Sequence, residues 1–228
     1  MRCAVAIFTK TIGYSKVKTR LAQTIGQSKA EEFFTLSIAC VEEMVSLAGE
    51  AFPEQISAVW AVAEEEALSA WSPRSFPAIW TGCGQLGTRL ATVSQTLFQT
   101  HDAVIMIGTD SPQLSPNVLI ETLSLLVSGE HRFVAGPALD GGFYLFGSTV
   151  PVPRKIWEGV AYSRNDTLVS LEAELVATGG TVKRIGPEQD VDVLEDLVRL
   201  KRTLESADPL PGTAKHTLLG WLSGQTLF

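Results

Sequence analysis

The stretch RCAVAIFTKTIGYSKVKTRLAQ, from Arg2 to Gln23, joins an apolar run to a strongly cationic segment. Residues 2–8 are predicted to form a buried β-strand, because an almost wholly apolar run of this length fits a strand inside a sheet. The segment behind the strand carries no acid and four cations, Lys10, Lys16, Lys18 and Arg20. The formal net charge of the chain is −7 and its first acidic residue is Glu31, so the sequence concentrates positive charge in one loop after its first strand.

Strand and helix patterns alternate along the rest of the chain. Further strands are predicted at 56–63, 76–80, 103–108, 132–138, 142–148 and 181–186. Helices are predicted at 27–50, 64–71, 86–99, 115–127, 166–178 and 193–204. This alternation predicts an α/β layered fold with a largely parallel sheet, in which ligands bind outside the carboxyl ends of the strands. Residues 1–205 are expected to form one domain, and residues 206–228 a tail that packs on the same domain.

The composition limits the class of protein and of partner. Hydrophobic residues make up 45% of the 228 residues and charged residues 19%, which is an ordinary globular balance. The pI near 5.0 disfavours a nucleic-acid or anionic-membrane surface, because phosphates repel a net-negative partner. Three cysteines without a C-x-x-C pair indicate free thiols, and no segment approaches the roughly 20 apolar residues that span a membrane. We therefore expect a soluble, cytoplasmic protein.

The cationic loop suits a ligand that carries several phosphates. Lysines act there as point charges, Arg20 can grip two phosphate oxygens, and a helix start behind the loop adds amide donors. A solvated surface loop is the alternative interpretation. The loop is not a Walker A motif, because G-x-x-x-x-G-K-[ST] is absent.

Three acidic residues follow predicted strands and are candidate metal ligands. In IGTDSPQL, Asp110 comes just after a fully apolar strand, and a carboxylate beside phosphates is a natural Mg²⁺ ligand. An Asx-turn that caps the strand–helix corner is the alternative for Asp110. In EQDVDVLEDL, Asp190 and Asp192 precede the last predicted helix. Asp192 is either a helix N-cap that forms a capping box with Glu195 or a second metal carboxylate.

Two glycine-rich stretches allow close approach of the backbone to a ligand. GCGQLGTRL has three glycines between a strand and a helix, with Arg89 one turn inside the helix, and suits a nucleobase or ribose. Its glycines also fit the letters of the dinucleotide pattern G-x-G-x-x-G. GPALDGGFYLFG places Asp140, Gly141 and Gly142 before an aromatic strand. A plain turn is the alternative for each stretch, before a helix in the first case and in a tight hairpin in the second.

Five motifs occur in the order seen in a bacterial family of glycosyltransferase-like proteins of the GT-A (nucleotide-diphospho-sugar transferase) superfamily, which the chain therefore resembles. They are FTK…KVKTRLA, GQLGTRL, GTDSPQL, GPALDGGFYLFG and DVDVLEDL. The pattern is more distantly similar to guanylyltransferases for 2-phospholactate and for the molybdenum cofactor. The resemblance covers about residues 1–204. It implies a three-layer, Rossmann-like GT-A sandwich that binds a nucleoside triphosphate or nucleotide-sugar with a divalent metal, Mg²⁺ or Mn²⁺.

The resemblance also implies roles for individual residues. Its phosphate-binding positions match Lys10, Lys18 and Arg20, and the candidate nucleotide site is completed by Lys16, Gln85 and Gly87. The metal-binding position after the central strand matches Asp110, and the late acidic motif matches Asp192 and, less closely, Asp190. The acceptor pocket matches Asp140 and Gly141, with Gly142 and Ser163 as further candidates. The candidate catalytic residues are Lys18, Arg20 and Asp110.

The chain departs from the family pattern where base and acceptor contacts are expected. TIGYSK replaces a segment that usually holds Pro and Gly, and YSR replaces a late W-S-T motif. Gln85 and Thr88 stand where acids are usual, and Val193 stands where Thr is usual. Substrate identity therefore does not follow from the resemblance.

The implied function is a metal-dependent transferase that moves a nucleotidyl or glycosyl group to a small acceptor. The lysine-rich loop and the single Asp110, in place of an Asp-x-Asp pair, favour nucleotidyl transfer, while the family resemblance favours glycosyl transfer. The alternative is a non-catalytic nucleotide-sugar binding protein with a degenerate acceptor site. The expected partners are a nucleotide or nucleotide-sugar and a small acceptor.

Overall fold

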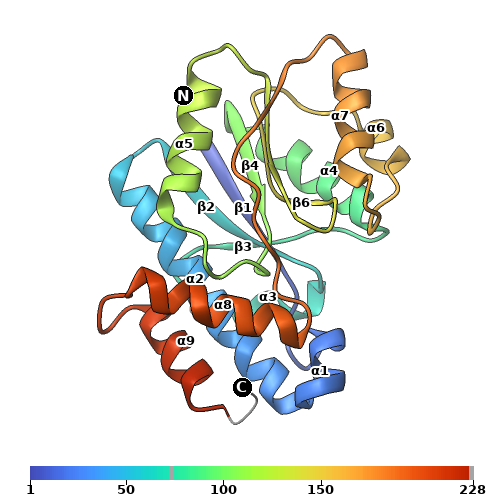
Figure 1. Cartoon of the computed structure of the whole chain (residues 1–228). Helices are drawn as coiled ribbons and strands as arrows, with labels where there is room; N and C mark the ends of the chain where they lie inside the picture. The colour runs from blue at the N-terminus through green and yellow to red at the C-terminus, as the bar shows by residue number, and fades with distance from the viewer. Residues whose placement is uncertain (72–73, 226–228) are drawn as a thin grey trace.

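The computed structural model describes residues 1–71 and 74–225, and in this part of the chain one seven-stranded sheet lies between layers of helices (Figure 1). The strands are β1 (Cys3–Thr9), β2 (Ile56–Val62), β3 (Ala78–Trp80), β4 (Ala103–Ile107), β5 (Phe133–Pro137), β6 (Phe143–Ser148) and β7 (Val182–Arg184). The helices are α1 (Thr19–Ile25), α2 (Gln27–Ala51), α3 (Leu68–Trp71) after the 3-10 turn η1 (Glu65–Ala67), α4 (Leu86–Leu97), α5 (Pro116–Val127), α6 (Arg154–Gly159), α7 (Thr167–Ala177), α8 (Leu194–Ala207) and α9 (Ala214–Ser223).

The sheet is mostly parallel, as the alternation of strands and helices predicted. Its order is β3-β2-β1-β4-β6-β5-β7. The neighbours β3, β2, β1 and β4 are parallel, whereas β6 runs antiparallel to both β4 and β5. Ile7 of β1 lies between Trp60 of β2 and Ile107 of β4, so these three strands end together at one edge of the sheet.

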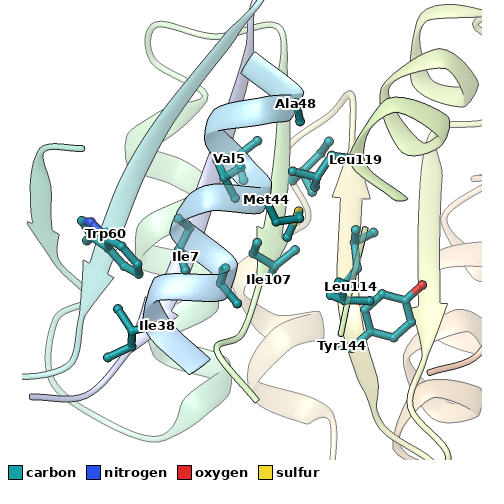
Figure 2. Close-up of a cluster of buried hydrophobic side chains, with 14 of the residues drawn as sticks. Val5, Ile7, Ile38, Met44, Ala48, Trp60, Ile107, Leu114, Leu119 and Tyr144 are labelled. Carbon is teal, nitrogen blue, oxygen red and sulfur yellow. The ribbon is translucent and has the colours of Figure 1, made fainter. Parts of the chain in front are cut away.

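Strand β1 is the centre of the core because both of its faces are covered. Cys3, Val5 and Ile7 belong to a cluster with side chains of α2 and α5 (Figure 2). Ala4 and Ala6 belong to a second cluster on the opposite face, with side chains of α4, α6 and α7. A strand buried on both faces reads as a continuous apolar run, which is the pattern seen in the sequence.

A third apolar cluster joins α8 and α9 to the amino-terminal helices α1 and α2. Leu197 of α8 and Leu218 of α9 are fully buried in it. In the same region the Lys215 ammonium donates hydrogen bonds to the carbonyl oxygens of Gln113 (2.9 Å) and Leu114 (2.7 Å). Helix α9 therefore contacts the loop that follows β4 as well as the helical layer.

The sequence patterns missed two short helices. Helix α1 has seven residues and ends at Gly26, whose φ of 86° breaks the helix before α2 begins. Helix α6 has six residues and starts after Pro153. Neither is long enough to show a helical repeat of apolar residues, which is the signal that identified the longer helices.

None of the helices in the two described ranges combines the length and the apolarity needed to cross a membrane.

The contact between α4 and α6 predicts a large effect of a very small substitution. A Cβ added to Gly87 would lie 2.2 Å from the carbonyl oxygen of Trp157, so Gly87→Ala must push the two helices apart. We expect it to lower the free energy of unfolding by about 1–3 kcal/mol, measured by urea denaturation.

The matched control is Gly220→Ala in α9, where an added Cβ meets no atom within 4 Å. There we expect a gain of up to about 1 kcal/mol, because alanine favours a helix over glycine. A Gly87→Ala protein as stable as the wild type would contradict the packing described for α4 and α6.

Candidate functional site

A cavity of about 990 Å³ lies at the edge of the sheet where β1, β2, β3 and β4 end. The loops that follow these four strands line it, together with the β5–β6 hairpin and the segment between α6 and α7. This is the position at which open α/β sheets bind ligands. The cavity wall includes most of the predicted site residues, namely Lys10, Lys16, Lys18, Arg20, Asp110, Asp140, Gly142, Ser163, Asp190 and Asp192.

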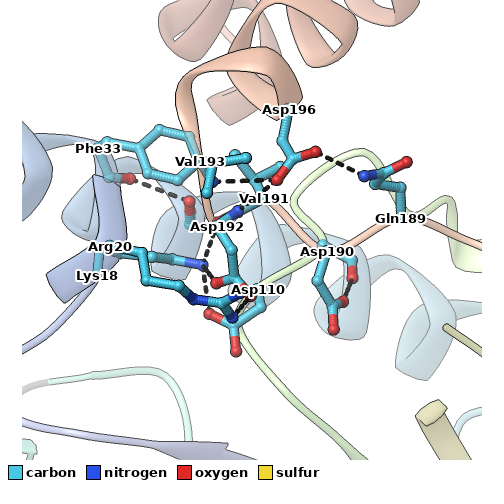
Figure 3. A network of polar contacts seen from close by, with 12 residues as sticks. Lys18, Arg20, Phe33, Asp110, Gln189, Asp190, Val191, Asp192, Val193 and Asp196 are labelled. Carbon is cyan, nitrogen blue, oxygen red and sulfur yellow. Dashed lines mark hydrogen bonds and ion pairs between the residues drawn. The ribbon is translucent and has the colours of Figure 1, made fainter. Parts of the chain in front are cut away.

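The Lys18 ammonium is the centre of an ion cluster in this wall (Figure 3). It lies 2.5 Å from Oδ1 of Asp110 and 3.6 Å from Oδ1 of Asp192, and it donates a hydrogen bond of 2.6 Å to the carbonyl oxygen of Val191. The Lys18 side chain is 2% exposed, while that of Asp110 is 49% exposed. Arg20 pairs with the other oxygen of Asp192 and is 66% exposed. The structure thus brings the cationic loop and the downstream carboxylates together.

The backbone at Lys18 is itself unusual. Lys18 precedes α1 with φ 45° and ψ 43°, a left-handed conformation that residues other than glycine rarely adopt. Its ammonium also lies 5.8 Å from the ring centroid of Phe33 on α2. The ion pairs and this ring contact help to hold the strained turn that aims the Lys18 side chain at the carboxylates.

Hydrogen bonds join the loop after β4 to the segment before α8. The amide of Val191 donates to the carbonyl oxygen of Asp110 (2.9 Å), and the Ser111 hydroxyl donates to Oδ1 of Asp190 (2.5 Å). The Gln113 side-chain amide donates to the carbonyl oxygen of Gln189 (2.7 Å). The two carboxylate-bearing segments are therefore held side by side by hydrogen bonds within the protein.

Helix α8 begins with a cap that differs from the predicted one. Its N-cap residue is Val193, and Oδ2 of Asp196 accepts hydrogen bonds from the amides of Asp192 and Val193, each 3.0 Å long. The alternative prediction, in which Asp192 is the N-cap and forms a capping box with Glu195, is therefore wrong. The carboxylate that caps the helix comes from Asp196, which leaves the Asp192 side chain to its contacts with Lys18 and Arg20.

The third carboxyl group of the cluster is harder to ionise than an ordinary aspartate. Burial raises the pKa of Asp190 to about 6, and the negative charges of Asp110 and Asp192 act in the same direction. The hydrogen bond from Ser111 and the charge of Lys18 oppose these effects. Asp190 is therefore a much weaker acid than an ordinary aspartate.

The donor set of the cluster has the chemistry that Mg²⁺ and Mn²⁺ require. These ions take carboxylate oxygens, and Asp110 and Asp192 already point an oxygen each toward one positive charge, that of Lys18. In the part of the chain that the structure describes, no group of three or more His, Cys, Asp or Glu side chains forms a ready metal site. The residues present fit a hard divalent cation through two carboxylates, with the remaining ligands left to phosphate oxygens and water.

The acceptor candidates divide into residues that face the cavity and one that does not. Asp140, Gly142 and Ser163 line the cavity, and Oδ1 of Asp140 accepts a hydrogen bond from the Gly142 amide (2.9 Å) in the β5–β6 turn. Gly141 is absent from the wall, and a Cβ added there would lie 2.2 Å from the carbonyl oxygen of Asn165. Gly141 therefore serves the packing of this hairpin against the segment before α7.

The glycine-rich loop after β3 shows the same division. Gln85 and Gly87 do not line the cavity, and Gly87 is the packing glycine between α4 and α6. Arg89 does line the cavity, and it donates hydrogen bonds of 2.7 Å to the carbonyl oxygen of Ala63 and to the Thr81 hydroxyl. Arg89 thus ties the ends of β2 and β3 together and shapes this side of the cavity.

Sequence reasoning missed several residues of the cavity wall. Glu64, Glu65 and Glu66 follow β2, and Tyr162 and Arg164 flank Ser163. The position of the three glutamates directly after a predicted strand was the available signal, because the ends of parallel strands meet at one edge. The sequence predicts a helix at 64–71, and this prediction alone gives the glutamates no role in a site.

The raised pKa of Asp190 predicts a pH-dependent gain in stability. An acid whose pKa is higher in the folded state destabilises the fold when it is ionised, so the cost grows as the pH rises from about 4 to about 6 and is complete above. Asp190→Asn removes this charge and keeps an oxygen for Ser111. We expect it to raise the free energy of unfolding by about 2 kcal/mol at pH 7.5 and by much less at pH 4.5, measured by urea denaturation without divalent cations. An equal gain at both pH values would show that charge is not the cause.

Comparison with known proteins supports the fold assignment. One solved structure, a protein of Desulfovibrio desulfuricans G20 provisionally described as a nucleotide-diphospho-sugar transferase, aligns with a TM-score of 0.83 and 21% identity over 98% of each chain. A CMP:2-keto-3-deoxy-manno-octonic acid synthetase in complex with CTP aligns with a TM-score of 0.58 and 14% identity over 92% of this chain and 100% of its own. The 4-diphosphocytidyl-2C-methyl-D-erythritol synthase of Anaerococcus prevotii DSM 20548 aligns with a TM-score of 0.57 and 9% identity over 87% and 95%.

At these identities the solved structures establish the fold, and they confirm the predicted GT-A-like sandwich. A search of curated protein sequences gave no significant match. A family model does match residues 46–164, which is more than half of the chain. The protein therefore belongs to the bacterial family described as "uncharacterized protein conserved in bacteria (DUF2064)".

Proposed function

We propose that the protein is a metal-dependent transferase that binds a nucleoside triphosphate and transfers its nucleotidyl group to a small acceptor. The observation that carries the proposal is the meeting of cationic and acidic side chains in one cavity. Lys10, Lys16 and Arg20 line the same cavity as the carboxylates of Asp110 and Asp192, and Arg20 pairs with Asp192. Exposed cations next to paired carboxylates suit a polyphosphate that binds together with a divalent cation.

Each group has a role that follows from its exposure. Lys10, Lys16 and Arg20 are exposed and bind the phosphate oxygens, with Arg20 able to donate two hydrogen bonds at once. Asp110 and Asp192 hold Mg²⁺ or Mn²⁺, which when bound offsets negative charge on the phosphates and on the leaving group. Lys18 orients both carboxylates through its contacts with each of them.

The size and the far wall of the cavity leave room for an acceptor. About 990 Å³ is at the upper end of the range for ligand pockets, so it accommodates more than a nucleotide. Asp140, Ser163 and Arg164 provide polar groups at the end formed by the β5–β6 hairpin and the α6–α7 segment. These groups are placed to bind the hydroxyl or acidic group that attacks the nucleotide.

Glycosyl transfer from a nucleotide-sugar is the second candidate. It is favoured by the extent of the alignment with the Desulfovibrio desulfuricans protein, which covers 98% of both chains. The fold shared with the CMP:2-keto-3-deoxy-manno-octonic acid synthetase, which was solved in complex with CTP, favours the first candidate. The products separate the two: nucleotidyl transfer releases pyrophosphate, and glycosyl transfer releases a nucleoside mono- or diphosphate. Nucleotide binding without either product would indicate a non-catalytic binding protein.

The role proposed for Asp110 predicts a selective loss of binding. We expect Asp110→Asn to abolish metal-dependent nucleotide binding and to lower any transfer rate roughly a hundredfold, because a fixed electrostatic contact at the phosphates is lost. The measurement is calorimetric titration with each of the four common nucleoside triphosphates in Mg²⁺, beside circular dichroism to verify the fold.

The matched control is Asp102→Asn. Asp102 is an exposed aspartate before β4, at the opposite edge of the sheet, where its carboxylate accepts a hydrogen bond from the Arg2 amide. This variant should bind nucleotide as the wild type does. Unchanged Mg-nucleotide affinity in Asp110→Asn would remove Asp110 from the metal site and with it the proposed mechanism.

A further inference from the structure

We propose that Lys18 is a resident counter-ion of the carboxylate pair, which keeps the divalent cation out until the phosphates of the nucleotide draw the Lys18 ammonium away. Metal and nucleotide would then bind together rather than independently. The inference rests on the proposed function, because it concerns the same metal and phosphate positions. It adds the order in which the ligands enter and the residue that imposes this order.

The first support is the place of the Lys18 ammonium. It contacts one oxygen of Asp110 and one of Asp192, and these two carboxylates are the ones that fit a metal. A dication bound to the same two oxygens would lie within a few ångströms of the ammonium. Like charges at that separation repel, and the Lys18 side chain is only 2% exposed, so little water screens its charge.

The second support is the balance of charge. The ammonium of Lys18 and the guanidinium of Arg20 already offset the negative charges of Asp110 and Asp192. A free metal ion therefore meets a pair of carboxylates whose charge is compensated, and it gains little by binding. A complex of the metal ion with a triphosphate carries net negative charge. The phosphates can then pair with Lys18 and Arg20, so that the cluster can accept the metal ion and the triphosphate together.

The third support is that the Lys18 ammonium can exchange its carboxylate partners for phosphate oxygens. A lysine ammonium sits on a flexible four-carbon stem and makes its hydrogen bonds one donor at a time, so it can exchange one anionic partner for another. Lys10, Lys16 and Arg20 stand in the same wall and would gather phosphate oxygens near it.

Substitution of Lys18 should therefore have two effects of opposite sign. Lys18→Met removes the competing charge, and we expect Mn²⁺ alone to bind about tenfold more tightly or better than in the wild type. The same variant loses a phosphate contact, and we expect inorganic tripolyphosphate in the presence of EDTA to bind about tenfold more weakly. A residue that only stabilised the fold would weaken both ligands together.

The first measurement is the free Mn²⁺ signal in electron paramagnetic resonance during titration of the full chain. Tripolyphosphate binding is measured in parallel by calorimetry, so that the unknown base of the nucleotide does not enter. Lys16→Met is the matched control, because it removes one positive charge from the same loop at an exposed position in the cavity wall. It should weaken tripolyphosphate binding and change Mn²⁺ affinity less than twofold.

Lys18→Gln keeps the result interpretable if Lys18→Met fails to fold, because its amide can still donate to the Val191 carbonyl oxygen. Tighter Mn²⁺ binding in either variant supports the inference. Mn²⁺ affinity that is unchanged or weaker in a folded variant overturns it, as does micromolar Mn²⁺ binding by the wild type alone. The proposed function fails by a separate result, namely nucleotide binding that is indifferent to Asp110→Asn.

Discussion

A buried ammonium group is tolerated in a protein only when anionic and hydrogen-bonding partners replace its water. Lys18 meets that condition with partners that the chain supplies about 90 and 170 residues later, since Asp110 follows β4 and Val191 with Asp192 precedes α8. The loop after β1 is thereby tied to two segments that local interactions could not bring to it. The same contacts place cations and carboxylates on one wall of the cavity. The ion pairs of Lys18 therefore both join the three segments and bring the charged groups of the site together.

Strand β6 runs opposite to both of its neighbours in the sheet, and this brings a hairpin to the cavity. The parallel strands β1 to β4 bring the cationic loop, the Glu64–Glu66 segment and Asp110 to one edge. The antiparallel strand β6 starts at that same edge, so the β5–β6 turn with Asp140 also lines the cavity. The loops of β1 and β4 and the β5–β6 hairpin belong to different elements, so these two parts of the cavity wall can vary in sequence independently.

The sequence predicted the strands, the longer helices and the parallel sheet, because apolar runs and helical repeats report directly on burial. It also predicted that Lys18, Asp110 and Asp192 would meet. It did not predict that Lys18 would be buried against those carboxylates, since nothing local distinguishes its ammonium from the exposed one of Lys16. The sequence suggests that Gly87 and Gly141 bind a ligand, because it does not show the backbone atoms of other segments that pack against them.

The attachment of α9 to the loop after β4 has a consequence for how the protein is made. Lys215 donates hydrogen bonds to the carbonyl oxygens of Gln113 and Leu114. The ribosome adds Lys215 to the chain 102 residues after Gln113 and 101 residues after Leu114. Strands β1 to β4 can pair on the ribosome while that loop still lacks its ammonium partner. The segment that carries Asp110 then acquires its final support only when α9 has left the exit tunnel, so nascent chains would pass through a stage with an assembled sheet and an unfinished ligand site.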